Sequence, residues 1–250
     1  MRRCNALISP FQVTTEGWNI DQLGTAFGRA VGGIAYLVPD FQNPTGALMD
    51  QATRQTVADI AARHGVTVVA DEIVRYIDLR NGAAAEPRIQ GAILLGSMSK
   101  TVWGGLRIGW LRGSTRLVRE LLVGRPAGSY APPPLEQLIA CELFTHIDAL
   151  VVQRRAELRS QRDHLAQLLE NDDSWEFTLP SGGLSLWLHL TRTSGVALSQ
   201  QAARHGLALT PGSQFSVDGS FVNWTRLPYT APIETLDRVA TSLKQSIHQR

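Results

Sequence analysis

A lysine set between hydroxyl side chains and an arginine is the feature of this sequence best suited to covalent chemistry. Lys100 follows Ser97 and Ser99, which come directly after the apolar stretch 92–96, and Arg107 stands seven residues further on. A lysine amine can form a Schiff base with a carbonyl compound, while hydroxyls and a guanidinium can hold a phosphate nearby. A surface lysine and arginine around a glycine-rich turn is the alternative for this segment taken alone.

Two more polar side chains follow apolar stretches that are typical of buried strands. Asn43 comes after the stretch 34–38, within an Asn-Pro-Thr-Gly turn, and Asp71 comes directly after the stretch 66–70. In open α/β sheets, ligands bind at the carboxyl ends of the strands, where both side chains are expected. A plain turn residue is the alternative for Asn43, and a helix N-cap is the alternative for Asp71.

Arg226, in the late segment Trp-Thr-Arg-Leu, offers a planar fork that suits a substrate carboxylate. A solvated surface arginine is the alternative. An acid such as Asp71 at a strand end can pair with a protonated ring nitrogen, and Lys100 can react with an aldehyde. Pyridoxal 5'-phosphate (PLP) carries an aldehyde, a ring nitrogen and a phosphate, so these residues together predict a site for this cofactor.

The elements that must position these residues follow an α/β pattern in the first part of the chain. Asp50 is expected to cap a helix that Gly65 ends. The β-branched, unalternating stretch 66–70 favours a parallel sheet covered on both faces. The expected strands are 34–38, 66–70, 92–96 and 106–112.

The later part changes to helix from about residue 114, and strands resume after residue 175. We predict a sheet-centred large domain over 1–145 and a smaller α+β domain over 146–250, linked by a long helix. The expected helices are 115–123, 134–145, 149–169, 197–205 and 232–247, and the expected strands are 175–179, 184–190, 207–210 and 221–226.

The bulk composition is that of an ordinary globular protein. The 250 residues are 44% hydrophobic and 18% charged, and the net charge of +2 is too small to indicate nucleic acid or an anionic membrane as partner. Cys4 and Cys141 lack metal-ligand spacing and favour reduced thiols, so no metal site is predicted. Since no apolar run approaches the roughly 18–20 residues of a membrane helix, a cytoplasmic location is expected.

In their order and spacing, the Asn-Pro-Thr-Gly, Asp-Glu and Ser-Met-Ser-Lys segments and the late arginine resemble the aminotransferase class I/II family. The resemblance implies the PLP-dependent transferase fold type I. The Trp-Gly-Gly-Leu-Arg segment after Lys100 is most similar to the aminotransferase-like domain of MocR-type regulators, in which that domain follows a winged-helix DNA-binding module. No basic DNA-binding segment is found in this chain.

The resemblance also implies a role for each residue. Lys100 would form the Schiff base and move the proton, while Ser97, Ser99 and Arg107 would hold the phosphate. The remaining three residues would act on the ring and the substrate: Asp71 would face the ring nitrogen, Asn43 would bind the ring oxygen at position 3', and Arg226 would bind the amino-acid carboxylate.

Two departures from the family pattern qualify this resemblance. Ile73 and Val74 stand where the family usually has a tyrosine after the aspartate. Only 42 residues precede Asn43, so an N-terminally truncated chain with an incomplete large domain is expected. Three functions follow: an aminotransferase acting on an amino acid and a 2-oxo acid, the effector-sensing domain of a MocR-type regulator, or an inactive remnant. The resemblance also implies a homodimer, because the family builds its active site at a homodimer interface.

Overall fold

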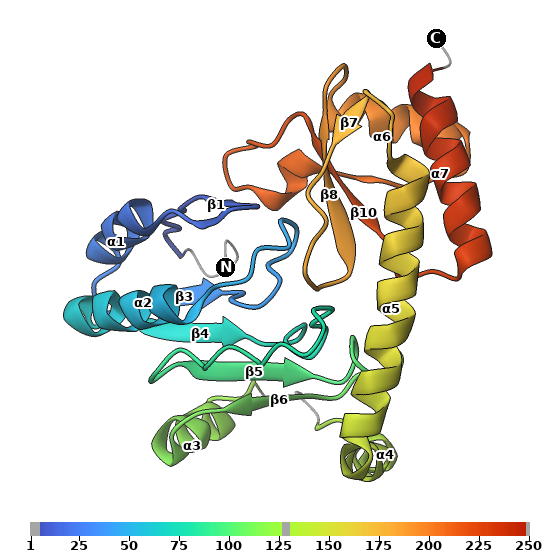
Figure 1. The fold of residues 1–250 in the computed structure, drawn as a ribbon. Coiled ribbons are helices and arrows are strands. Elements are labelled where there is room, and N and C mark those ends of the chain that lie inside the picture. The colour runs from blue at the N-terminus through green and yellow to red at the C-terminus, as the bar shows by residue number, and fades with distance from the viewer. Residues whose placement is uncertain (1–5, 127–130, 249–250) are drawn as a thin grey trace.

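The computed structural model describes residues 6–126 and 131–248, which form two four-stranded sheets and a small hairpin (Figure 1). The first sheet contains β3 (Ile34–Leu37), β4 (Thr67–Asp71), β5 (Ile93–Ser97) and β6 (Gly109–Arg112), in that order. The first three strands are parallel, and β6 returns antiparallel beside β5. The predicted α/β class and mostly parallel sheet are therefore confirmed.

Helix α2 (Gln51–His64) begins and ends where its sequence predicts. The Asp50 carboxylate accepts a hydrogen bond of 2.7 Å from the Thr53 amide, which satisfies a backbone donor that the helix leaves free. The helix ends at Gly65, whose φ of 64° lies in the left-handed region that favours glycine. These two ends fix the length of the connection between β3 and β4.

The chain before β3 forms structure that the sequence did not predict. A hairpin precedes a helix whose apolar residues Leu23 and Phe27 are buried against the first sheet together with α2. The helix begins after Asn19, whose side chain accepts from the Gln22 amide. These elements are β1 (Val13–Thr14), β2 (Gly17–Trp18) and α1 (Ile20–Arg29).

The two faces of the first sheet are covered unequally. Val68 and Ala70 of β4 are buried, and Val68 belongs to the apolar cluster under α1 and α2. Val69 and Asp71 alternate with them and are only partly buried. Within the described residues, the face under α1 and α2 is covered as expected. The opposite face is only partly covered, so the expectation of a sheet covered on both faces is wrong for that face.

The β6 side of the first sheet is the more open. All four residues of β6 are exposed, and no residue of α3 (Thr115–Val123), which the structure describes in full, is buried. The next helix, α4 (Pro134–Thr145), contributes Ala140 to a small cluster with Met98. Both helices have the predicted bounds.

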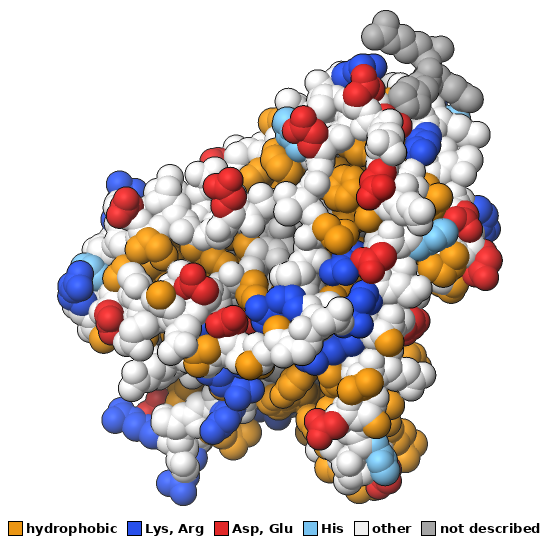
Figure 2. Space-filling model, viewed as in Figure 1, with side chains coloured by type: hydrophobic (Ala, Val, Ile, Leu, Met, Phe, Trp, Pro, Cys, Tyr) orange, Lys and Arg blue, Asp and Glu red, His pale blue; other side chains and the backbone are white. Residues whose placement is uncertain are grey.

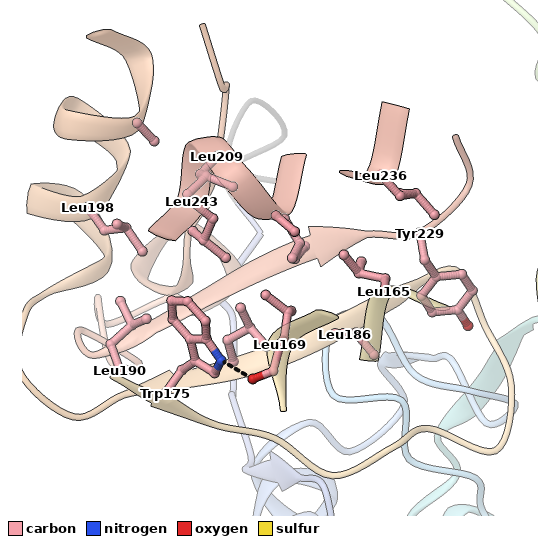
Figure 3. Packing of buried hydrophobic residues seen from close by; sticks show 14 of the residues in the cluster. Leu165, Leu169, Trp175, Leu186, Leu190, Leu198, Leu209, Tyr229, Leu236 and Leu243 are labelled. Atoms are coloured by element: carbon pink, nitrogen blue, oxygen red, sulfur yellow. Dashed lines mark hydrogen bonds between the residues drawn. The ribbon is translucent and has the colours of Figure 1, made fainter. Parts of the chain in front are cut away.

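A long helix, α5 (Ile147–Leu169), runs beside both sheets and leads into the second sheet (Figure 1). Leucine side chains from its second half pack with residues of the second sheet and the last helix in one buried cluster (Figure 3). In that cluster the Trp175 indole donates to the Leu169 carbonyl at 3.0 Å. The remaining elements are β7 (Trp175–Glu176), β8 (Ser185–Leu190), α6 (Gly195–Arg204), β9 (Thr210–Pro211), η2 (Gly212–Phe215), β10 (Trp224–Pro228) and α7 (Ile233–His248), with the sheet order β7-β8-β10-β9.

Arginines of α5 connect the two parts of the molecule. Arg159 donates to the carbonyl of Leu79 at 3.0 Å, and Arg162 donates to the carbonyl of Pro180 at 2.7 Å. Because α5 contacts both parts, the predicted domain boundary between residues 145 and 146 stays a prediction. Cys141 is an exposed free thiol, and Cys4 lies outside the described residues.

Candidate active site

Four of the predicted site residues line one cavity of about 510 Å³: Asn43, Asp71, Lys100 and Arg226. The cavity lies at the carboxyl ends of β3 and β4 and is closed on its other side by residues of β8 and β10. Its volume falls in the range of roughly 300–1,000 Å³ that small-molecule sites occupy. The segments that carry these residues are far apart in sequence, so the fold brings the predicted chemistry together.

Asp71 holds a hydrogen bond at each carboxylate oxygen. The Ile73 amide donates to Oδ1 at 3.0 Å, and the Tyr36 hydroxyl donates to Oδ2 through a short hydrogen bond. The first bond is local, of the kind that the alternative helix-cap interpretation would require, but Asp71 also lines the cavity. Burial of Tyr36, its hydrogen bond to Asp71 and the charge of Asp71 together raise the pKa of Tyr36 above its ordinary value.

Asn43 and Arg226 meet across the cavity. The Arg226 guanidinium donates from Nη1 to Asn43 Oδ1 at 3.1 Å, and it lies 4.9 Å from the centre of the Phe215 ring. Burial lowers the pKa of Arg226 below its ordinary value. The Nε atom of Arg226 is buried and has no hydrogen-bond partner among the described residues. A partly buried guanidinium that lines the cavity and makes no ion pair with the described residues suits a carboxylate ligand.

An ion-pair network fixes the two loops from which Asn43 and Asp71 project. Arg54 pairs with Asp40 at 2.8 Å, and both side chains are buried. Arg75 Nη1 lies 3.3 Å from Asp40 Oδ1 and 3.8 Å from Glu72 Oε1. Arg88 Nε lies 2.9 Å from Glu72 Oε2. Because Asp40 follows β3 and Glu72 follows β4, the network ties the carboxyl ends of both strands together.

A glycine-containing segment of the second part also forms the cavity wall. Gly182 and Gly183 line the cavity. A Cβ atom on Gly182 would overlap Phe41 and the Ile77 carbonyl, and one on Gly46 would approach Pro180 to 2.9 Å. Glycine is therefore needed at these points for the two parts to approach each other closely.

The three predicted phosphate ligands do not line this cavity in the structure. The Ser97 hydroxyl lies 3.0 Å from both the Ser99 hydroxyl and the Ile108 carbonyl oxygen, so it is engaged within the turn between β5 and β6. Arg107 is exposed, has a left-handed φ of 54°, and makes no side-chain hydrogen bond or ion pair with the described residues. The structure thus brings Ser97 and Ser99 together in this turn, outside the lining of the cavity, and leaves the Arg107 guanidinium without a side-chain partner among the described residues.

Tyr36 is the cavity residue of most chemical interest that the sequence did not predict. It lies on β3, opposite Val69 of β4 in the parallel register. Side chains alternate along a strand, so Tyr36 and Asp71 share the face that α1 and α2 leave uncovered. The stretch 34–38 is apolar throughout, so nothing in the sequence indicated the face on which Tyr36 lies, and the partner strand and register were not known.

The fold is that of the PLP-dependent transferases of fold type I. The model of the aminotransferase class I and II family matches residues 13–243, and the chain belongs to this family. The 2-aminoadipate transaminase of Thermus thermophilus is 29% identical over 236 residues, which cover 89% of this chain and 58% of that protein.

Solved structures agree with this assignment. The α-aminoadipate aminotransferase LysN from Thermus thermophilus, complexed with N-(5'-phosphopyridoxyl)-L-leucine, has a TM-score of 0.85 at 26% identity. The match covers 95% of this chain and 65% of LysN. The cofactor of that complex supports the PLP prediction. This chain therefore spans about three fifths of the length of the relatives that it matches first.

Transcriptional regulators are also among the relatives. NorG of Staphylococcus aureus, an HTH-type regulator, is 28% identical over 160 residues, covering 61% of this chain and 36% of the regulator. Both branches that the sequence resembles are thus represented. No helix of the described residues is long and apolar enough to cross a membrane.

Proposed function

We propose that this chain provides the ring-binding and substrate-binding part of a PLP-dependent aminotransferase site, which exchanges an amino group between an amino acid and a 2-oxo acid. One observation carries the proposal: an amine, a carboxylate, an amide and a guanidinium from four distant segments line a single cavity. A cytoplasmic location and a homodimer, both expected from the sequence, belong to the same proposal.

The groups in the cavity match the parts of PLP in chemical type. Asp71 has no ion-pair partner among the described residues, so its negative charge is available to a protonated ring nitrogen. Asn43 uses its amide oxygen toward Arg226, which leaves its amide nitrogen as a donor for a ring oxygen. PLP, when bound, would supply an aldehyde for the Lys100 amine and a ring that withdraws electrons from the substrate.

The chain's own residues would then divide the remaining work. Arg226 would bind the substrate carboxylate through its guanidinium, with the Phe215 ring fixing the plane of that group. The Lys100 amine, at the cavity wall, would take up and return the proton of the substrate carbon. Ser97, Ser99 and Arg107, at the turn between β5 and β6, would hold the phosphate.

The sequence offers a matched control for the test of Lys100, because its only other lysine is Lys244. Purified protein mixed with PLP is expected to gain an absorption band near the edge of the visible range. Lys100→Ala should abolish the band, whereas Lys244→Ala should leave it unchanged. Identical spectra for the wild type and Lys100→Ala would overturn the proposal.

The similarity to NorG favours a second function, in which the same cavity senses an amino-acid effector without turnover. The two functions separate when PLP-loaded protein is mixed with amino acids and a 2-oxo acid. Formation of the new amino acid supports the aminotransferase, and a spectral change without product supports the sensor. An inactive remnant would show neither.

The homodimer has a separate observation in its support. Hydrophobic side chains gather over the lower end of the molecule in Figure 2, where α4 lies in Figure 1. Leu135 and Leu138 of α4 are 66% and 68% exposed, which is unusual for leucine on a surface that nothing covers. A covered α4 would also bring the turn that follows Lys100 close to the interface, because α4 packs against Met98.

A further inference from the structure

Tyr36 and Asp71 come from neighbouring parallel strands and face the same cavity. The register places Tyr36 opposite Val69, so Asp71 lies two positions further along β4 on the same face. The phenol spans this offset and donates to Asp71 Oδ2. Tyr36 lies on a strand that the sequence motifs of the site do not include.

The hydrogen bonds of Asp71 leave its charge intact. Nearby guanidinium groups are engaged elsewhere: Arg75 pairs with Asp40 and Glu72, and Arg88 pairs with Glu72. Among the described residues, Asp71 therefore receives neutral donors only, from Tyr36 and the Ile73 amide. Each carboxylate oxygen has room for a second hydrogen bond, so a cation arriving in the cavity meets an acceptor that is already oriented.

We propose that Tyr36 is a positioning residue, which fixes the Asp71 carboxylate in the orientation that receives the protonated ring nitrogen of PLP. The inference rests on the proposed function, since it assigns a role within the same site. A neutral donor suits this task because an arginine in its place would compete with the ring nitrogen for the carboxylate. The raised pKa of Tyr36 keeps the phenol protonated, and so a donor, throughout the neutral range.

The test compares Tyr36→Phe with Tyr76→Phe, which removes an exposed phenol that does not line the cavity. PLP binding is followed by absorbance titration. Loss of one hydrogen bond to a charged group is expected to weaken PLP binding about tenfold in Tyr36→Phe. The Tyr76→Phe protein should bind within about twofold of the wild type.

Two further arms ask whether Tyr36 acts through Asp71. In an Asp71→Asn background, Tyr36→Phe should add less than about a twofold further loss, because the carboxylate that it orients is gone. A PLP analogue with carbon in place of the ring nitrogen should bind equally to the wild type and to Tyr36→Phe. A full loss in either arm would overturn the positioning role and assign Tyr36 to general packing.

The outcomes separate this inference from the proposed function. A wild-type chain that binds no PLP overturns both, whereas a Tyr36→Phe protein that binds like the wild type overturns the role of Tyr36 alone. If Tyr36→Phe does not fold, carbon-13 NMR of the tyrosines in Asp71→Asn replaces it. Tyr36 should then titrate nearer the ordinary value of about 10, and an unchanged titration would overturn the coupling.

Discussion

The two sheets differ in how fully the chain covers them, and the candidate site divides along the same line. Three consecutive residues of β8, Leu186, Trp187 and Leu188, are buried, whereas all four residues of β6 are exposed. The groups that meet in the cavity lie between the first sheet and the second. The predicted phosphate ligands lie in the turn that leads to the exposed β6.

The two ends of the proposed cofactor site therefore lie in surroundings that the chain covers to different extents. The ring end depends on the contact between the two sheets, which α5 bridges, and on the buried ion pairs that tie the ends of β3 and β4 together. The phosphate end depends on the β6 side, where α3 contributes no buried residue.

We expect the largest change in the free energy of unfolding from a substitution in the buried core of the second sheet. Leu186→Ala removes a fully buried side chain from the cluster of the second sheet and should cost about 3 kcal/mol of unfolding free energy. Leu122→Ala, on the exposed face of α3, should change it by less than about 0.5 kcal/mol. Urea unfolding measures both. Equal costs for the two variants would contradict the unequal cover of the sheets.

The next prediction concerns the open side. Arg107→Gln removes the guanidinium proposed for the phosphate and should weaken PLP binding about tenfold. The affinity for pyridoxal, which lacks the phosphate, should change by less than about twofold. Absorbance titration with both compounds checks this. If both affinities fall equally, Arg107 supports the fold of the turn and not the phosphate.

We expect a smaller change in the free energy of unfolding from a substitution of the residue that caps α2. Asp50→Ala removes the cap and should cost about 1 kcal/mol at neutral pH. The hydrogen bond from the Thr53 amide lowers the pKa of Asp50. Because its pKa is lower in the folded state, Asp50 stabilises the fold at pH values above its unfolded-state pKa of about 3.9. This stabilisation is lost as the pH falls through the folded-state pKa.

Thermal unfolding as a function of pH measures this contribution. The difference between the wild type and Asp50→Ala should be constant from pH 7 to about pH 5 and should shrink below about pH 4. A difference that grows on acidification would show that Asp50 is not a cap stabilised by its charge.

Local signals predicted the helices well and the short strands less well. The ends of α2 followed from a capping aspartate and a left-handed glycine, both of which act within a few residues. The expected strand 221–226 begins three residues later, because Phe221 has a φ of 62° and β10 starts at Trp224. A left-handed residue cannot be inferred from apolar content alone.

The site residues were predictable where the chemistry of the side chain indicates its ligand. They were not predictable where the contact depends on which strands pair. Asn43, Asp71 and Lys100 were expected from their chemistry and their places after apolar stretches, and Arg226 was expected from its chemistry alone. Tyr36 was missed because only the pairing of β3 with β4 brings its phenol to Asp71.

We propose that Lys100 is the amine that reacts with PLP in this cavity. The most direct measurement treats the protein with PLP, reduces the product with borohydride, and locates the added mass by peptide mapping. Because the sequence contains only two lysines, the account predicts the phosphopyridoxyl group on Lys100 and an unmodified Lys244. Modification of Lys244 to the same extent as Lys100, or of Lys244 alone, would contradict it.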